Sequence, residues 1–317
     1  MALIWALLVQ GAQMLLVLAA APLLTGLVRR AKARLNRRVG PPLLQPYREL
    51  WRLARKEVVL AENANWLFRA APYLIFAATW VAAALVPTFA TGLEFSWAAD
   101  LIAIIAFLGT ARFFQALAGM DVGTSFGGIG SSREMMIASL AEPAMLMMVF
   151  TVALIAGSTQ LSTVAEVMVA GVGLRVSLAL ALVALIMVAL AENGRIPIDN
   201  PATHLELTMV HEAMVLEYSG RHLALIEFAA SLKLELYLSL IACLFAPWGM
   251  AAAGTGAAPA MIGIAAWTAK LGVGGVLLAL FETTIAKMRV FRVPDFLGAA
   301  LMLGLLATLL RFVSAGM

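Results

Sequence analysis

The chain has 317 residues, of which 63% are hydrophobic and only 13% are charged, with a formal net charge of +4. An ordinary globular protein is about 45–50% apolar and about 25% charged. This excess of apolar residues cannot fit inside a soluble core, and it excludes a soluble enzyme, a nucleic-acid binder and a disordered scaffold. The composition therefore predicts a polytopic membrane protein.

The few cysteines and histidines restrict the redox chemistry. The single cysteine, Cys243, excludes a disulfide framework, an iron–sulfur cluster and a Cys-based zinc site carried by this chain alone. The three histidines are too few and too scattered for a pair of haem ligands. We therefore predict no metal site, no cofactor and no catalytic residue in this chain, so that any redox cofactor belongs to a partner.

The fold class follows from the lengths of the apolar stretches. A membrane-spanning helix needs about 20 mostly apolar residues. The first stretch has no basic segment before it and no small-residue cleavage site, so we expect a retained helix. We predict an all-α membrane protein, with residues 1–317 forming a single polytopic membrane domain. Eight stretches qualify as spans, at about 3–27, 70–90, 98–119, 135–157, 174–192, 222–248, 258–284 and 295–315.

The basic residues predict the orientation. Seventeen of the 22 Lys and Arg fall in alternate connections between spans, eleven of them in residues 28–69, whereas the opposite connections hold only Arg175 and Arg311. Loops rich in Lys and Arg stay in the cytoplasm. We therefore expect both termini outside and the large loops in the cytoplasm.

Residues 43–58 are expected to form an amphipathic helix after the first span, because apolar residues recur at helical spacing opposite a charged face. Gly40-Pro41-Pro42 gives it a rigid start. Two interpretations stay open. The helix can lie on anionic lipid, or it can act as a lateral gate or a docking strip for a soluble subunit.

Segment 119–134 contains five glycines. It does not match a phosphate-binding loop, because Ile129-Gly130 stands where Lys-Ser/Thr is needed. We expect a flexible loop that packs closely against another backbone.

The connection between the fifth and sixth spans is expected to be helical over 201–217, with Asn200 as the N-cap and Gly220 after its end. At 100° per residue, one stripe holds His204, Thr208, His211 and Glu212, and a nearly opposite stripe holds Glu206 and Glu217. We expect this helix to be wedged among other protein surfaces beside a polar cavity. Val215 stands where a zinc-protease motif needs its second His, so a metal site is rejected.

Ionisable residues within the spans are the second unusual feature. A charged side chain at mid-bilayer costs about 2.5–3.5 kcal/mol on insertion scales. Such residues act either as ion pairs between helices or as a path for protons or cations. We expect Arg112 to be structural, Lys233 to pair with an acid on a neighbouring helix, and Glu192 to pair with Arg195. The predicted path consists of Glu142, Glu192, Glu227, Lys233, Glu235, Lys270 and Glu282.

These residues resemble a known family. GPPLLQPYRELWRL after the first span, GMDVGTSFGGIGSSRE before the fourth, AENGRIPIDNPATHLELTMVHEAMVLEYSG after the fifth and the eight spans resemble the respiratory complex I subunit 1 family over the whole chain. SREMM, Ala141-Glu142-Pro143, Ser231-Leu232-Lys233, Ala246-Pro247-Trp248-Gly249 and ALFETTIAKMR resemble one branch of it, the membrane-anchor subunits of formate hydrogenlyase and hydrogenase-4.

The resemblance implies a non-catalytic subunit of a multisubunit oxidoreductase in a bacterial or archaeal cytoplasmic membrane. It would bridge antiporter-like membrane subunits to a cytoplasmic arm that carries iron–sulfur clusters and either a [NiFe] centre or a quinone-reducing site. The resemblance places seven residues in the coupling loop against that arm: Arg195, Asp199, His204, Glu206, His211, Glu212 and Glu217.

One departure separates the two branches. Ala202 and His204 occupy places where complex I is expected to have Glu, which changes the charge repulsion in the loop. This favours the anchor and coupling subunit of a membrane-bound hydrogenase, with hydrogenase large and small subunits as cytoplasmic partners and protons, or Na⁺, as the ion. The alternatives are a quinone-binding subunit of an NADH:quinone oxidoreductase and a stand-alone secondary transporter.

Overall fold

The computed structural model describes residues 2–171, 175–199, 209–252 and 256–315, and regular structure within these ranges is helical apart from two isolated β-bridges. Two short 3₁₀ turns lie at Ser96–Ala98 and Val290–Arg292. The α-helices are α1 Ala2–Leu35, α2 Gln45–Ala54, α3 Trp66–Leu85, α4 Leu101–Asp121, α5 Ser125–Ala156, α6 Leu161–Val169, α7 Val176–Glu192, α8 His211–Val215, α9 Gly220–Phe245, α10 Ala257–Thr284 and α11 Val293–Ala315.

Seven of the helices in the described ranges are long and apolar enough to cross a membrane, namely α1, α3, α4, α5, α9, α10 and α11. Helix α7, in the fifth predicted span, is apolar but only 17 residues long. The all-α membrane fold is therefore confirmed, whereas a count of eight spans stays a prediction.

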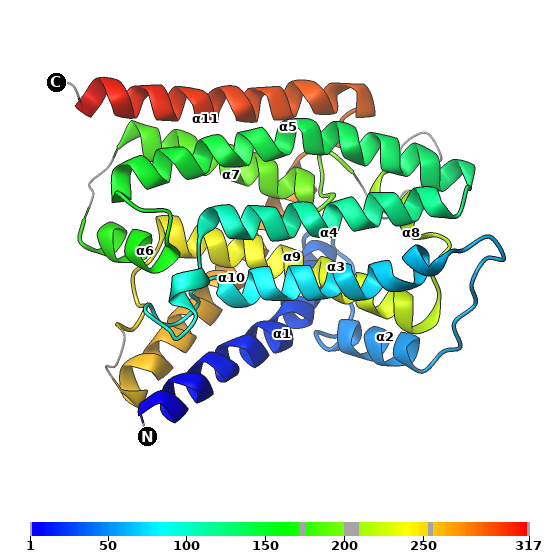
Figure 1. Cartoon of the computed structure of the whole chain (residues 1–317), viewed down its shortest axis with the longest axis horizontal. Coiled ribbons are helices and arrows are strands. Elements are labelled where there is room, and N and C mark those ends of the chain that lie inside the picture. Colours follow the sequence, from blue (N-terminus) through cyan, green and yellow to red (C-terminus); the bar gives the residue numbers. More distant parts are fainter. Residues whose placement is uncertain (1, 172–174, 200–208, 253–255, 316–317) are drawn as a thin grey trace.

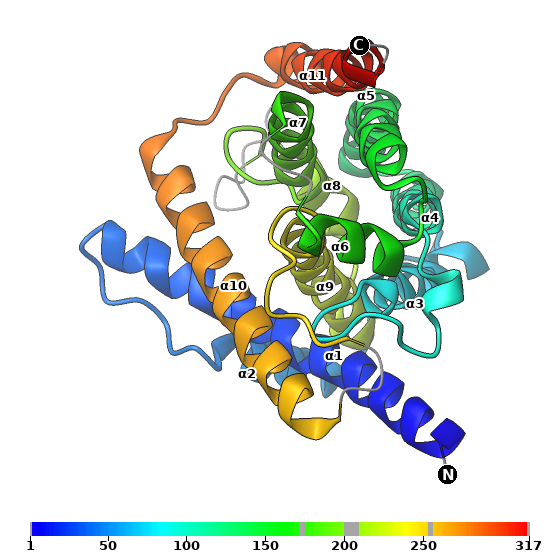
Figure 2. The ribbon, with the colours of Figure 1, turned by 90° about the vertical axis from the view of Figure 1, so that its left-hand side faces the viewer.

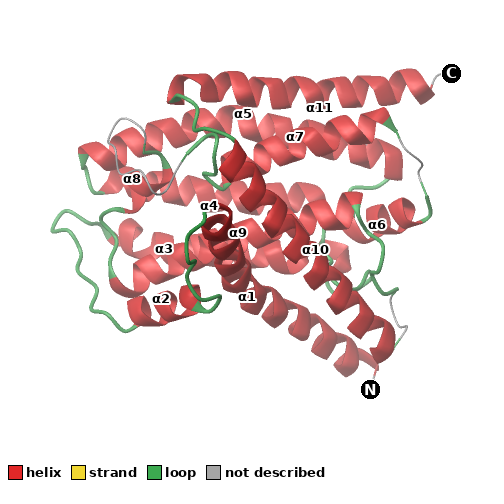
Figure 3. Ribbon diagram, turned by 180° about the vertical axis from the view of Figure 1, so that it is seen from behind, coloured by secondary structure: helices red, strands yellow, loops and turns green. Residues whose placement is uncertain are grey.

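The long helices pack in layers (Figure 1). Helix α11 lies along α5 and α7, and α3 packs beside α4 and α9 below them. Helices α1 and α10 contact each other and cross the other helices at a steep angle (Figures 2 and 3). Both termini lie at the same end of the bundle as α6.

Loops distant in sequence meet at each end of the bundle. At the end that holds α2 and α8, Ser219 bonds Val59, Asn65 bonds Asp121, and the Met288 N–H donates to the Pro197 carbonyl. We call this the basic end, because the connections with many Lys and Arg lie there. At the opposite end, the Leu101 N–H donates to Thr159 and the Thr91 N–H donates to Ala251.

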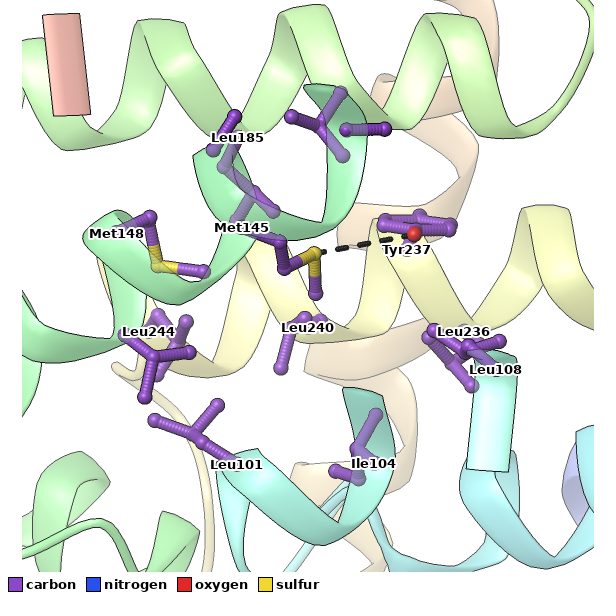
Figure 4. Packing of buried hydrophobic residues seen from close by; sticks show 14 of the residues in the cluster. Leu101, Ile104, Leu108, Met145, Met148, Leu185, Leu236, Tyr237, Leu240 and Leu244 are labelled. Carbon is purple, nitrogen blue, oxygen red and sulfur yellow. Dashed lines mark hydrogen bonds between the residues drawn. The ribbon is translucent and has the colours of Figure 1, made fainter. Parts of the chain in front are cut away.

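The core of the bundle is apolar and tightly filled between α4, α5, α7 and α9 (Figure 4). Leu240 and Leu244 of α9 are fully buried against Leu101 of α4 and Met148 of α5. The Tyr237 hydroxyl points to the Met145 sulfur at 3.9 Å. Fully burying one such side chain stabilises the fold by about 1.5–3 kcal/mol, so this region sets how the helices pack.

Three expectations about the loops need correction or refinement. The amphipathic helix is confirmed as α2, shorter than 43–58. The glycine-rich segment 119–134 is not a flexible loop. It forms the end of α4 and the start of α5, with a turn at 122–124. Its close backbone contact is real, because a Cβ on Gly127 would collide with the Gly119 carbonyl.

The predicted helix 201–217 was also partly wrong. Residues 209–210 are not helical, α8 spans only His211–Val215, and Leu216 and Glu217 form a turn. Residues 200–208, which include His204 and Glu206, lie outside the described residues.

Candidate functional site: a charged cavity at the basic end

A cavity of about 330 Å³ lies between α1, α3, α4, α9 and α10, next to the end of α7, the loop after it, and α8. Its location beside α8 agrees with the polar cavity expected there. The lining includes charged or titratable side chains from six helices and one loop: Arg29, Lys32, Arg112, Glu192, Arg195, Asp199, His211, Glu212, Glu227, Lys233 and Glu282.

Arg112 of α4 is the centre of an ion-pair cluster beside this cavity. Its guanidinium lies 3.0 Å from Glu142 and 3.5 Å from Glu134, and it donates a hydrogen bond to Glu192. Lys233 of α9 lies 3.2 Å from the second oxygen of Glu192. Three carboxylates thus share one guanidinium and one ammonium group.

The cluster is mostly buried, which makes its charge balance important. The side chains of Arg112, Glu134 and Glu192 are 5%, 3% and 2% exposed, whereas that of Glu142 is 45% exposed. Removing one partner from a buried pair costs about 3–5 kcal/mol, because the other charge stays desolvated. His211 of α8 lies 3.3 Å from Glu134 and so links the loop to the cluster.

A second cluster surrounds Glu282 near the end of α10. Lys32 of α1 lies 3.1 Å from one carboxylate oxygen, and Arg195 lies 3.4 Å from the other. Burial lowers the pKa of the Arg195 guanidinium, and Glu282 opposes that shift. Lys287 lies 3.0 Å from Asp199, whose other oxygen accepts the Val210 N–H. These contacts hold both ends of segment 195–210.

The Glu217-Tyr218-Ser219-Gly220 motif fastens the loop to its surroundings. The Tyr218 ring stacks on Phe68 of α3, its hydroxyl donates to the Phe68 carbonyl at 3.0 Å, and burial raises the pKa of that hydroxyl. Ser219 forms two hydrogen bonds of 2.8 Å with the Val59 backbone. Gly220 has φ +54°, and a Cβ there would lie 2.7 Å from the Glu57 carbonyl. Tyr218, Ser219 and Gly220 are therefore structural, and Glu217 is exposed outside the cavity lining.

The structure gathers many of the residues expected to act together. Glu192, Glu227, Lys233, Glu282, Arg195, Asp199, His211 and Glu212 line the cavity. The expected pairing of Lys233 with an acid on another helix is confirmed. The expected pairing of Glu192 with Arg195 was wrong, because Glu192 faces Arg112 and Lys233 whereas Arg195 turns to Glu282.

Three path candidates are absent from the cavity lining, namely Glu142, which pairs with Arg112, and Glu235 and Lys270. Glu235 is fully buried, and its carboxylate accepts a hydrogen bond from Ser239. Lys270 donates to the Trp248 carbonyl at 2.6 Å, near the end opposite the basic end. Within the described ranges, no group of three or more His, Cys, Asp or Glu is arranged to hold a metal ion.

Sequence reasoning missed Glu134, Arg29 and Lys32. Glu134 was missed because the glycines before it predicted a loop, although Thr124 is an N-cap whose side chain accepts the Gly127 N–H. Recognising that cap would have extended the helix back to 125 and put Glu134 two turns before Glu142. Arg29 and Lys32 were counted only for orientation, yet α1 carries them into the cavity.

Comparison with known proteins identifies the family. The family model described as NADH dehydrogenase matches residues 9–313. The chain belongs to the NADH dehydrogenase family. The expected resemblance to complex I subunit 1 is thereby confirmed.

Proteins similar to this chain include two that are named for formate hydrogenlyase and hydrogenase-4. Formate hydrogenlyase subunit 4 of Escherichia coli K12 is 34% identical over 89% of this chain and 91% of its own length. Hydrogenase-4 component C of the same organism is 35% identical over 76% and 75%. NADH-quinone oxidoreductase subunit 8 of Rhodothermus marinus is 31% identical over 66% and 62%.

A solved structure supports the same fold. A chain of the membrane-bound sulfane sulfur reductase, an archaeal respiratory membrane complex, superposes with a TM-score of 0.78, covering 95% of this chain and 99% of that one. At 18% identity this likeness concerns the fold alone.

Proposed function

We propose that this chain is the membrane anchor and energy-coupling subunit of a complex I-related membrane-bound hydrogenase, linking redox chemistry in a cytoplasmic arm to translocation of protons or Na⁺. The observation that carries the proposal is the charged cavity, with its buried acids held between two cationic groups and a loop at the basic end. The relatives named for formate hydrogenlyase and hydrogenase-4 favour the hydrogenase type.

The redox arm is proposed to dock on the basic end, which faces the cytoplasm, with both termini outside a bacterial or archaeal cytoplasmic membrane. Hydrogenase large and small subunits would supply the [NiFe] centre and iron–sulfur clusters, and this chain would supply none. The loop after α7 would be the contact, because it carries Arg195 and Asp199 and continues to His211 beside Glu134.

Coupling would depend on the charge balance of the Arg112 cluster. Three carboxylates there face two cationic side chains, so a proton added near Glu192 or Glu134 balances the cluster. A shift of the loop moves His211 relative to Glu134, and Arg195 relative to Glu282. Because buried charges are weakly screened, each shift changes the affinity of neighbouring acids for protons.

Glu142 is the proposed exit to a neighbouring subunit. It lies near the middle of α5, and its 45% exposed side chain would face lipid if nothing covered it. Such exposure costs several kcal/mol at mid-bilayer. An antiporter-like membrane subunit against α4 and α5 would remove that cost and receive the proton.

A quinone-binding subunit of an NADH:quinone oxidoreductase is the second candidate. The relative named NADH-quinone oxidoreductase subunit 8 and the cavity between α1, α3 and α9 favour it. A stand-alone transporter receives no support from the family to which the chain belongs.

Purification of the complex from its own membranes separates these functions. With a tag on the chain, we expect a co-purifying subunit with nickel and hydrogen evolution from a reduced dye. Nickel absent from the complex, together with NADH oxidation by an added quinone, would contradict the hydrogenase assignment and support the second candidate.

Ion movement is tested with Glu227→Gln in the same complex reconstituted into liposomes. We expect unchanged assembly and a fall of about half or more in protons moved per electron, because an acid lining the cavity is lost. The matched control is Glu166→Gln on the exposed side of α6, away from the cavity. An unchanged ratio in Glu227→Gln would remove that residue from the path.

A further inference from the structure

Helix α9 carries a stripe of polar side chains that runs well beyond the cavity. Glu227, Ser231, Glu235, Ser239 and Cys243 follow one another at four-residue intervals. Neighbouring members of the stripe lie about 40° apart around the helix axis, so the stripe winds around α9 as it rises about 24 Å at 1.5 Å per residue. That length approaches the hydrocarbon thickness of a bilayer, about 30 Å.

The first two members belong to the cavity, and the next two do not. Glu227 and Ser231 line it, whereas Glu235 and Ser239 are 0% and 2% exposed and absent from its lining. The stripe therefore leads from the cavity of the basic end to a buried region deeper in the bundle.

Glu235 is incompletely partnered in that region. One carboxylate oxygen accepts the Ser239 hydroxyl at 2.5 Å, and the residues that the structure describes supply no hydrogen-bond partner for the other. Among the described residues, no Lys, Arg or His lies within ion-pair distance of it. An ionised carboxylate without a cation is too costly in such surroundings, so Glu235 is held there with a proton bound.

Trp267 of α10 fixes Ser239 in a way that suits proton transfer. Its indole N–H donates to the Ser239 oxygen at 2.9 Å, and an indole only donates. Trp267 is itself buried, in an apolar cluster between α1, α9 and α10. The indole thus fixes the oxygen, and the hydroxyl donates to Glu235.

Lys270 of α10 lies near the end opposite the basic end. It follows Trp267 by three residues, and its side chain is half-buried with the ammonium group on the Trp248 carbonyl, at 2.6 Å, in the loop after α9. A side chain on a helix leans toward the N-terminus, which for α10 is toward this outer end. Trp248 itself is exposed.

We propose that Glu227, Ser231, Glu235 and Ser239 form an outward proton route inside this chain, which leaves the bundle at Lys270. The inference rests on the proposed function and adds an outlet that does not pass through a neighbouring subunit. Lys270 first releases a proton to outer water and is left as an amine. The Ser239 hydroxyl proton then passes through bridging water to the Lys270 amine and restores its ammonium group, while Ser239 accepts the proton of Glu235 and Glu235 is reprotonated from the cavity. Each group ends as it began.

The test measures protons moved per electron by the whole complex in liposomes, with the rate of electron transfer measured in parallel. We expect Glu235→Gln and Lys270→Met each to lower the ratio by about half or more, with electron transfer within about twofold of the wild-type rate. The control Ser139→Ala removes an exposed hydroxyl from α5 and should leave the ratio unchanged. If Glu235→Gln prevents assembly, Ser239→Ala breaks the route with a smaller change.

The outcomes separate this inference from the proposed function. If Glu227→Gln lowers the ratio and neither Glu235→Gln nor Lys270→Met does, the outward route is refuted and the coupling function stands. If none of the three lowers it, the outward route is refuted and Glu227 is also removed from the path, whereas the hydrogenase assignment is decided by the co-purification experiment. A merely structural Trp267–Ser239–Glu235 cluster would reduce yield and thermal stability at a constant ratio, which also refutes the route.

Discussion

The two ends of the bundle are built on different principles. Around Leu240 and Met148, α4, α5, α7 and α9 pack through buried apolar side chains. At the basic end, α4 and α9 line a cavity together with α1, α3 and α10, and ion pairs centred on Arg112 and Glu282 join the elements around it. Apolar packing fixes one arrangement, whereas ion pairs can exchange partners when a proton is added. The contrast indicates a rigid apolar region that supports an adjustable charged one at the basic end.

Replacing Arg112 should give the largest loss of stability, because it removes the centre of the charged cluster at the basic end. Arg112→Met leaves Glu134 and Glu192 buried without the guanidinium, and we expect a loss of about 3–5 kcal/mol in stability. Thermal unfolding of the purified complex in detergent measures it. Arg52→Met on the exposed face of α2 is the control, and equal melting of the two variants would disprove the buried cluster.

Truncation of the apolar core should cost somewhat less. Leu240→Ala removes a fully buried side chain, and we expect about 2–5 kcal/mol of destabilisation, with protons moved per electron unchanged. Leu277→Ala, at a side chain 59% exposed on α10, is the control and should melt close to wild type. A changed proton ratio in Leu240→Ala with normal stability would show that the rigid region is not merely a support.

The smallest effect is expected at the edge of the basic end. Glu49 of α2 lies 3.0 Å from Arg29, and the two side chains are 37% and 46% exposed. Such exposed pairs contribute about 0–1 kcal/mol, so Glu49→Gln should change the melting temperature very little. A large drop in melting temperature would contradict this. It would mean that α2 is held to α1 mainly by this pair, which would then stabilise the fold as much as the buried clusters do.

The spans and the amphipathic helix could be predicted from the sequence because apolar length and helical periodicity are local properties. The identity of the residues that form each ion pair could not be predicted from the sequence. Arg195 is three residues after Glu192, yet the turn at 193–194 carries it toward Glu282, 87 residues away. The glycines of 119–134 predicted a loop, whereas packing of Gly127 against α4 favours the helix. His204 and Glu206 lie outside the described residues, so their part of the site stays a prediction.

The most direct test of the account concerns Glu142, where the buried Arg112 cluster reaches the surface of the helix bundle. The measurement is protons moved per electron by the reconstituted complex carrying Glu142→Gln, beside Glu166→Gln. The account predicts normal assembly and hydrogen turnover with the ratio reduced by about half or more in Glu142→Gln alone. Equal ratios in the two variants, at wild-type values, would contradict it.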